Sequence, residues 1–274
     1  MTLEKLYQAK HELWLKFLYG SFAVDQVEIK EKLYEFSRIE FRHLKWLANT
    51  LKEKNIEYNY DKNQIDIQKK TNFEYFEFLI HSIKSCVKHY NPNEVLSSRM
   101  VSDEFYFIRE LEQLLQNQSN NSNITAFDRK KNYKDLDEES KNALTIFLFE
   151  ESYKEYELIL LYSYFQNYTD DILLYNIYQD MIDESHYHLK SFGQMMAYMG
   201  ILAIPRLVFE PLYKNKDVKK FLIDGIAEEE EAKAQCAKLA SSIKDEDISK
   251  FLTFVMFQEN YHIALMEKAI ARFK

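Results

Sequence analysis

Residues 227–262 read AEEEEAKAQCAKLASSIKDEDISKFLTFVMFQENYH, and this stretch decides the fold. It contains two segments with apolar residues at every third or fourth position, separated by the polar turn 244–247. Such spacing predicts two amphipathic helices that pack as an antiparallel pair. The first segment carries four consecutive glutamates, 228–231, and the second carries Glu259-Asn260-Tyr261-His262.

The same periodicity extends over most of the chain. It predicts helices over 3–24, 25–54, 72–90, 94–117, 140–167, 170–199, 216–243 and 246–273. Only 4 glycines and 3 prolines occur among the 274 residues, too few for the turns that a sheet protein requires. The sequence therefore predicts an all-α fold.

A polar segment divides these eight helices into two groups. Residues 117–123 read NQSNNSN, and the lysine- and aspartate-rich stretch that follows has too little apolar surface to pack as a helix. We interpret residues 118–139 as a linker between an N-terminal four-helix bundle, 1–117, and a C-terminal one, 140–274. A less regular connection with Pro205 and Pro211 joins the second and third helices of the C-terminal bundle, as a long crossover would.

Composition excludes several classes of protein. The net charge of −8, with no basic block, argues against nucleic-acid binding. No stretch of about 20 uncharged apolar residues predicts a membrane span, and the N-terminus has no signal-peptide pattern, so we expect a cytoplasmic protein. Two cysteines, Cys86 and Cys236, are too few for a disulfide framework or a four-thiolate iron site.

The motif Glu259-x-x-His262 places a carboxylate and an imidazole on one helix face, where both could bind one metal ion. Across a tight helical hairpin, residues equidistant from the turn lie at the same height. Around the turn 244–247, Glu259 faces the glutamate run 228–231, with Glu229 nearest to the symmetric point. Glu229 also lies on the apolar face of its helix, where an unpaired carboxylate would be costly to bury. A partner or a metal is implied, although the ligand within 228–230 stays open.

The turn 167–170 gives a second pairing by the same test. It places Glu151 opposite Glu184, and His188 follows Glu184 by four residues, a spacing that also shares a helix face. Asp183 with His186, opposite Glu150, is the alternative.

We favour Glu184 with His188 because the sequence around His188 recurs elsewhere. Residues 188–192, HLKSF, repeat the pattern of 43–47, HLKWL. A one-residue bulge before His188 would account for the changed spacing, and such bulges occur at functional sites.

The predicted metal ligands are therefore Glu151, Glu184, His188, Glu229, Glu259 and His262. This set resembles the di-iron carboxylate site of the ferritin-like superfamily. The cadence AEEEE at 227–231, CAKLA at 236–240 and QENYH at 258–262 is most similar to its rubrerythrin branch. The resemblance covers roughly residues 140–273.

The resemblance implies two iron ions, with manganese as an alternative, in a site that reduces peroxide or dioxygen. It implies that Glu184 and Glu259 bridge or chelate, that His188 and His262 each bind one ion, and that Glu151 and Glu229 are terminal ligands. The four-cysteine iron domain of rubrerythrins is missing, so a separate electron-donor protein would be needed.

In the N-terminal bundle, pairing residues equidistant from a turn yields only part of a ligand set. A second Glu-x-x-His motif lies at Glu40 and His43, but the point opposite Glu40 falls near Gln8. Glu77 mirrors Glu104, yet the residue three after Glu104 is Phe107. We expect a ferritin-like bundle with an altered or absent metal site, in which Glu40 and His43 either form a core hydrogen-bonded pair or bind metal.

Three functional hypotheses follow. The first is a non-haem di-iron, or manganese and iron, oxidoreductase. The second is a non-catalytic iron-binding or scaffold protein, whose first bundle serves dimerisation or partner docking. The third is a purely structural helical protein, in which the acidic positions face water rather than each other.

Overall fold

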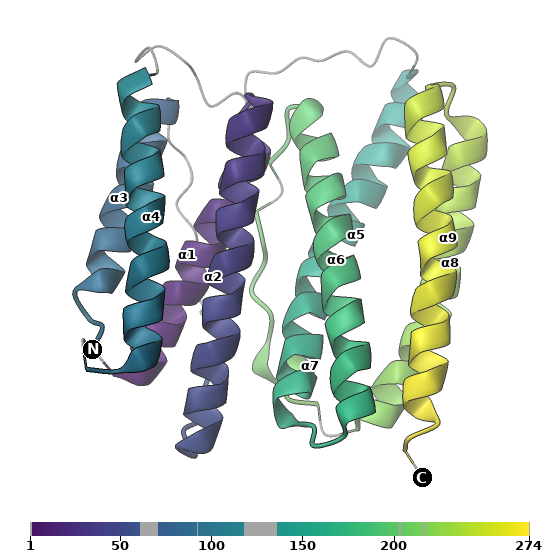
Figure 1. Cartoon of the computed structure of the whole chain (residues 1–274). Helices are drawn as coiled ribbons and strands as arrows, with labels where there is room; N and C mark the ends of the chain where they lie inside the picture. The colour runs from purple at the N-terminus through teal and green to yellow at the C-terminus, as the bar shows by residue number, and fades with distance from the viewer. Residues whose placement is uncertain are drawn as a thin grey trace. The chain divides into compact units, whose positions relative to one another are not determined.

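The computed structural model describes residues 2–60, 71–91, 93–117, 136–202, 204–215 and 217–273. The regular elements within these ranges are all α-helices, so the prediction of an all-α chain is confirmed. Most of the predicted linker, 118–135, lies outside the described residues. Two compact units divide the chain (Figure 1): unit 1 comprises residues 1–129 and 200–204, and unit 2 comprises residues 130–199 and 205–274.

Unit 1 contains four long helices: α1 Leu3–Ala23, α2 Val27–Glu53, α3 Asn72–Val87 and α4 Val95–Asn117. Local chemistry fixes the start of α3. The Thr71 hydroxyl accepts the Glu74 N–H at 3.1 Å, and the Glu74 carboxylate accepts the Thr71 N–H at 3.4 Å, which together form a capping box.

Unit 2 contains four long helices and one short one: α5 Glu138–Tyr168, α6 Ile172–Tyr198, α7 Glu210–Tyr213, α8 Val218–Ser242 and α9 Glu246–Ile270. Each long helix follows an aspartate whose side chain accepts backbone N–H groups of the first turn: Asp137, Asp171, Asp217 and Asp245. The short α7, with Pro211 in its first turn, was not predicted and interrupts the connection before α8.

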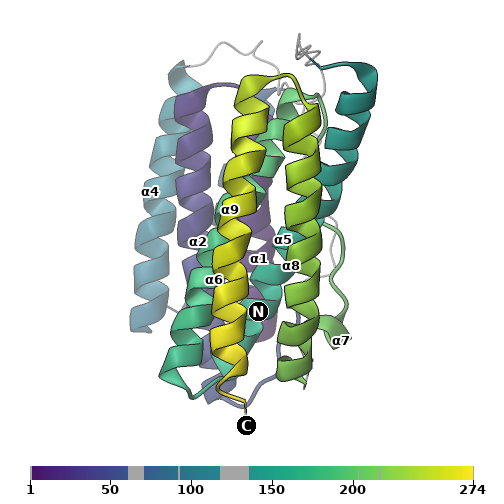
Figure 2. The ribbon, with the colours of Figure 1, turned by 90° about the vertical axis from the view of Figure 1, so that its right-hand side faces the viewer.

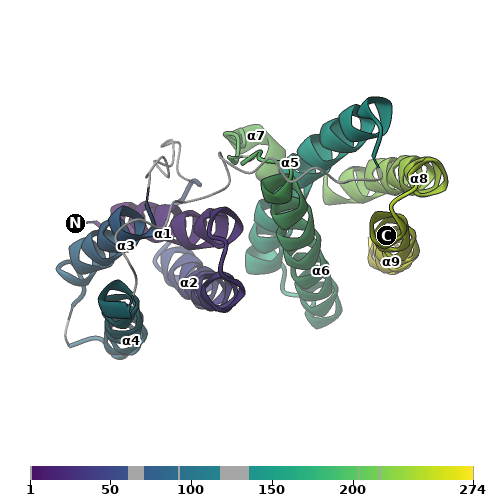
Figure 3. The same ribbon diagram turned by 90° about the horizontal axis from the view of Figure 1, so that it is seen from above.

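The long helices of unit 2 pair in a fixed order. α5 packs on α6 and α8 on α9, while α5 also contacts α8 and α6 contacts α9. Figure 2 shows α8 and α9 side by side, and Figure 3 views the four helices from above. α6 ends at one end of the unit and α8 begins at the other, so the intervening chain is a crossover and neighbouring helices are antiparallel (Figure 1).

Unit 1 has the same neighbour relations. α1 packs on α2 and α3 on α4, while α1 contacts α3 and α2 contacts α4. Helices α1, α2, α3 and α4 therefore correspond in order to α5, α6, α8 and α9.

The core of unit 2 is apolar at both ends and charged in the middle. Fully or almost fully buried apolar residues include Leu144, Leu148, Ile159, Leu160, Ile182, Leu189, Met196, Leu222 and Leu252. The buried carboxylates and imidazoles of unit 2 include Glu155, His188, Glu229, Glu259 and His262. Among the described helices, none has the length and apolar character that crossing a membrane requires.

Candidate metal centre

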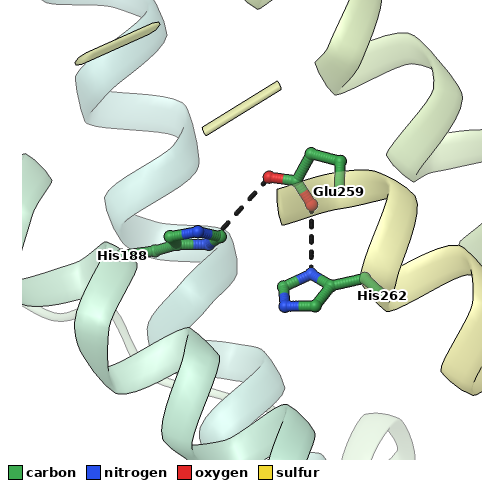
Figure 4. A group of neighbouring side chains, drawn as sticks. All are labelled: His188, Glu259 and His262. Atoms are coloured by element: carbon green, nitrogen blue, oxygen red, sulfur yellow. Dashed lines mark ion pairs between the residues drawn. The ribbon is translucent and has the colours of Figure 1, made fainter. Parts of the chain in front are cut away.

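Glu259 lies between two imidazoles at the centre of unit 2 (Figure 4). Its Oε2 is 3.0 Å from His262 Nδ1, one turn further along α9, and its Oε1 is 3.9 Å from His188 Nδ1 on α6. The two imidazole ring centroids are 5.3 Å apart. Ligand atoms of all three residues lie within 4.8 Å of one another, close enough to bind one metal ion.

Two further carboxylates reach this cluster from the remaining long helices. Glu155 on α5 places Oε1 2.8 Å from His188 Nδ1, and Glu229 on α8 places Oε1 3.8 Å from His262 Nδ1. Both side chains are buried, at 4% exposure each. Carboxylates from α5, α8 and α9 and imidazoles from α6 and α9 therefore converge in the interior of unit 2. We call these five residues the unit 2 cluster.

Among the described residues, the ligand atoms of the unit 2 cluster that are buried without a hydrogen-bond partner include His262 Nε2 and Glu155 Oε2. Leaving such an atom unsatisfied costs roughly 1–3 kcal/mol, and more for a charged group. The cluster thus has unused capacity to bind a cation.

Electrostatic balance in the unit 2 cluster depends on protons when no cation is present. Burial alone would lower the pKa of His188, but attraction to Glu155 outweighs it and raises the pKa to about 9. Burial raises the pKa of Glu259 to about 8, against its hydrogen bond with His262. Burial would also raise the pKa of Glu229, yet hydrogen bonds with His262 and Glu259 outweigh it and hold the pKa at about 2.

The same carboxylates act on the second imidazole. Burial opposes the charged form of His262, but hydrogen bonds with Glu229 and Glu259 raise its pKa well above the ordinary value. Protons therefore supply the positive charge that three buried carboxylates require. A divalent cation would displace those protons from the nitrogen and oxygen atoms that bind it.

Four of the predicted ligands belong to the unit 2 cluster: His188, Glu229, Glu259 and His262. Within the acidic run 228–231, Glu229 alone is buried, and the other three are exposed. Glu229 lies on the face of α8 that also buries Leu222, Ala232 and Cys236. The apolar periodicity of α8 therefore selects the inward-facing glutamate.

Glu184, another predicted ligand, lies behind His188. Its Oε2 accepts a hydrogen bond from Gln258 Nε2 at 2.9 Å, and the Gln258 carbonyl oxygen accepts one from His188 Nε2 at 3.1 Å. These two hydrogen bonds keep a proton on Nε2 of His188. The lone pair of the neutral imidazole is therefore on Nδ1, which faces Glu155 and Glu259. Glu184 and Gln258 orient the imidazole rather than contact the centre.

Glu151, the remaining predicted ligand, is half-buried one turn before Glu155 on α5. Burial raises the pKa of its carboxyl to about 7, with opposing effects from Lys154 and from Glu155 and Glu229. Its place one turn from Glu155 on the same helix, and its interaction with Glu155 and Glu229, put Glu151 within electrostatic range of the unit 2 cluster.

Sequence reasoning missed Glu155 because it located the α5–α6 turn at 167–170. The turn lies between Tyr168 and Ile172, and its centre is Asp170. Glu155 then mirrors Ser185, three residues before His188. If the start of α6 is taken from its capping residue Asp171, the pairing of equidistant residues gives Glu155 with Ser185.

The alternative pair, Asp183 and His186, is not among the groups with metal-binding geometry in the described residues. Asp183 is exposed and accepts a hydrogen bond from Gln179 at 2.9 Å, whereas His186 is buried.

A cleft of about 600 Å³ lies between α5, α7 and α8, near the unit 2 cluster. Lys154 lines it, with Nζ 3.6 Å from Glu228. Burial lowers the pKa of Lys154, but attraction to Glu229 and Glu151 outweighs it, so the net shift is upward. The Lys154 ammonium therefore lines the cleft and is attracted to the carboxylates of Glu229 and Glu151.

The motif at Glu40 and His43 also forms a buried cluster, in unit 1. Ligand atoms of Glu40, His43 and Glu104 approach one another closely enough to bind a metal. Here, however, a lysine ammonium, that of Lys10, forms ion pairs with both carboxylates.

Family models, curated proteins and solved structures provide no match to this chain. In the part of the chain that the structure describes, fold and site together define an all-helical protein with two buried carboxylate and histidine groups that have metal-binding geometry.

Proposed function

We propose that unit 2 is a ferritin-like bundle that binds two iron ions, or manganese in their place, and reduces peroxide or dioxygen. The observation that supports this proposal is the convergence of buried carboxylates and imidazoles from four helices around Glu259. Carboxylate and imidazole ligands suit iron and manganese, and this composition is typical of dinuclear sites in four-helix bundles.

The proposed ligands are Glu151, Glu155, His188, Glu229, Glu259 and His262. They supply four carboxylates and two imidazoles, the complement that a dinuclear bundle site uses. α6 contributes no carboxylate three residues before its histidine, because that position is Ser185. In our proposal Glu155 on α5 supplies the missing carboxylate, since its Oε1 already lies 2.8 Å from His188.

Two ferrous ions held by these residues would supply the two electrons that reduce one peroxide, with two protons, to two waters. The protein's own groups position the reaction. Glu259 lies between both imidazoles, and the Gln258–Glu184 chain orients His188. The Phe192 ring stacks on the His188 imidazole, with 5.7 Å between the ring centroids.

Electrons must come from outside this chain in the proposed reaction. The sequence has two cysteines, Cys86 and Cys236, whereas an iron–sulfur centre is usually held by four cysteine thiolates. We therefore propose a separate electron-donor protein, as the resemblance to rubrerythrins implies.

A second candidate, iron binding without turnover, is favoured by Ser185. Its hydroxyl is buried and lacks a hydrogen-bond partner among the described residues, at the position where a Glu-x-x-His pair would have its carboxylate. Replacement of that carboxylate is a change expected when catalysis has been lost but the bundle retained.

Metal analysis of the protein purified from iron-supplemented culture tests the proposal. We expect about two iron or manganese ions per chain. Glu259→Ala should remove them, whereas Glu230→Ala, which changes an exposed glutamate on α8, should leave them bound. A folded wild-type chain that binds no metal would contradict the proposal.

Peroxide consumption with an artificial electron donor separates the two candidates. The oxidoreductase should turn over peroxide, and the Glu259→Ala variant should not. Full metal loading without turnover of either peroxide or dioxygen would favour the binding protein.

A further inference from the structure

Lys10 is completely buried in unit 1, at 0% exposure. Its Nζ forms an ion pair with Glu40 on α2 and lies 2.5 Å from Glu104 Oε1 on α4. The Tyr90 hydroxyl donates a hydrogen bond to the same Glu104 oxygen. An isolated ammonium would cost several kcal/mol to bury, so these two carboxylates are what keeps Lys10 inside.

The imidazole of His43, in this same cluster, has the orientation that a metal-binding histidine would have. Its Nε2 lies 3.1 Å from Asp103 Oδ2, while Nδ1 faces Glu40 with Oε2 3.5 Å away. Asp103 is itself held by Arg99 at 3.0 Å. A carboxylate that fixes the outer nitrogen of an imidazole is the usual support of a histidine ligand.

The two units place these groups in matching register. The α1–α2 turn is centred on Asp25, and the α5–α6 turn on Asp170. Lys10 precedes Asp25, and Glu40 follows it, by the same number of residues. Glu155 and Ser185 lie at that same sequence distance before and after Asp170.

Three positions can therefore be compared directly between the units. Lys10 takes the place of Glu155, Glu40 takes the place of Ser185, and His43 corresponds to His188. The last long helices differ. On α4 the residue three after Glu104 is Phe107, whereas on α9 the residue three after Glu259 is His262.

We propose that Lys10 is the resident cation of unit 1, where it occupies the place of a divalent metal ion among Glu40, His43 and Glu104. Its ammonium neutralises the carboxylates and repels metal ions, so unit 1 binds none. Removal of this amine opens a site for one divalent cation. The inference rests on unit 1 alone and does not require unit 2 to bind metal.

Cobalt(II) binding to a chain silenced in unit 2 by Glu229→Gln and Glu259→Gln tests this inference. With Lys10 intact, we expect no bound cobalt. Adding Lys10→Ala should produce about one bound cobalt per chain, with a visible d–d absorption band and a higher melting temperature when cobalt is added. A further His43→Ala should abolish the band. Lys10→Met, which removes the charge but fills the space, is the matched control and should bind none.

Two results would overturn the inference. One is cobalt bound by the silenced chain with Lys10 intact and lost on Glu104→Gln. The other is a folded Lys10→Ala chain, verified by circular dichroism, that binds no cobalt. Lys10→Ser, whose short side chain also leaves the space open, replaces Lys10→Ala if the alanine variant does not fold, and the first measurement uses native Lys10 in any case. Metal binding by unit 2 is measured on the unsilenced chain, so the two proposals can fail separately.

Discussion

The burial of the Glu155 carboxylate indicates that a positive charge or a proton is needed beside it. At 4% exposure its carboxylate has one oxygen beside His188 and a second without a partner among the described residues. A surface glutamate would gain nothing from such a position, because water solvates it well. In the core the same group requires a cation or a proton.

Glu155→Gln is expected to weaken metal binding to unit 2 by at least about 100-fold, since loss of an outer partner alone typically costs 10–100-fold. The amide keeps the volume but loses the negative charge. Titration with cobalt(II), followed by absorption, gives the affinity.

Glu150→Gln is the matched control on α5, because Glu150 is exposed. It should bind cobalt as tightly as the wild type. An unchanged affinity in Glu155→Gln would remove Glu155 from the ligand set and leave Glu151 as the α5 ligand.

The contact between α1 and α3 depends on a glycine. A Cβ atom at Gly20 would lie within 3.0 Å of the Tyr75 ring, whose hydroxyl donates a hydrogen bond to the Lys16 carbonyl at 2.5 Å. The ring cannot move away without losing that bond. Gly20 thus allows two helices to approach closely, even though glycine is unfavourable within a helix.

Gly20→Ala should therefore destabilise the protein by about 1–3 kcal/mol, the usual cost of overpacking, in spite of a gain of roughly 1 kcal/mol in helix propensity. Urea unfolding followed by circular dichroism measures the change.

Gly225→Ala in α8 is the control for this effect. There a Cβ atom would meet only the flexible end of Met266, at 3.2 Å and 3.3 Å, which can yield. This variant should be neutral or more stable. A Gly20→Ala protein of equal or greater stability would contradict the proposed close contact.

The whole molecule combines two bundles with the same helix order and different sources of positive charge. In unit 1 the cation is covalently attached, as Lys10. In unit 2 the half-buried Lys154 lies on the cleft side, 3.6 Å from Glu228 and attracted to Glu229, and no fully buried lysine or arginine accompanies Glu155, Glu229 and Glu259 in the described residues. Protons or a bound metal must supply the remaining positive charge, so the stability of unit 2 should depend on metal.

Removal of metal with a chelator should consequently destabilise α5, α6, α8 and α9 and leave α1–α4 unchanged. A metal present at 100 times its Kd contributes about 2.7 kcal/mol to stability. Hydrogen exchange with mass spectrometry, read helix by helix, locates the loss of protection. Equal loss in both units, or none in unit 2, would argue against this division.

Local patterns in the sequence determined the helices. Apolar spacing and aspartate or threonine caps act within a few residues, so the eight long helices appear within a few residues of the predicted ranges. The same local rule identified the face of α8 that buries Glu229, and the i,i+3 spacing brought Glu259 and His262 together.

Only the tertiary structure decided which groups complete each cluster. Residues one turn apart, such as Glu151 and Glu155, share a helix face, and the rotation and register of the whole helix select between them. A shift of one residue in the centre of a hairpin moves the mirrored partner by two, which is why sequence symmetry pointed to Gln8 where the structure has Lys10. The helices and most of the candidate ligands followed from the sequence alone. The packing of the helices determined that Lys10 lies among the carboxylates of unit 1 and that the carboxylates and imidazoles of unit 2 face one another.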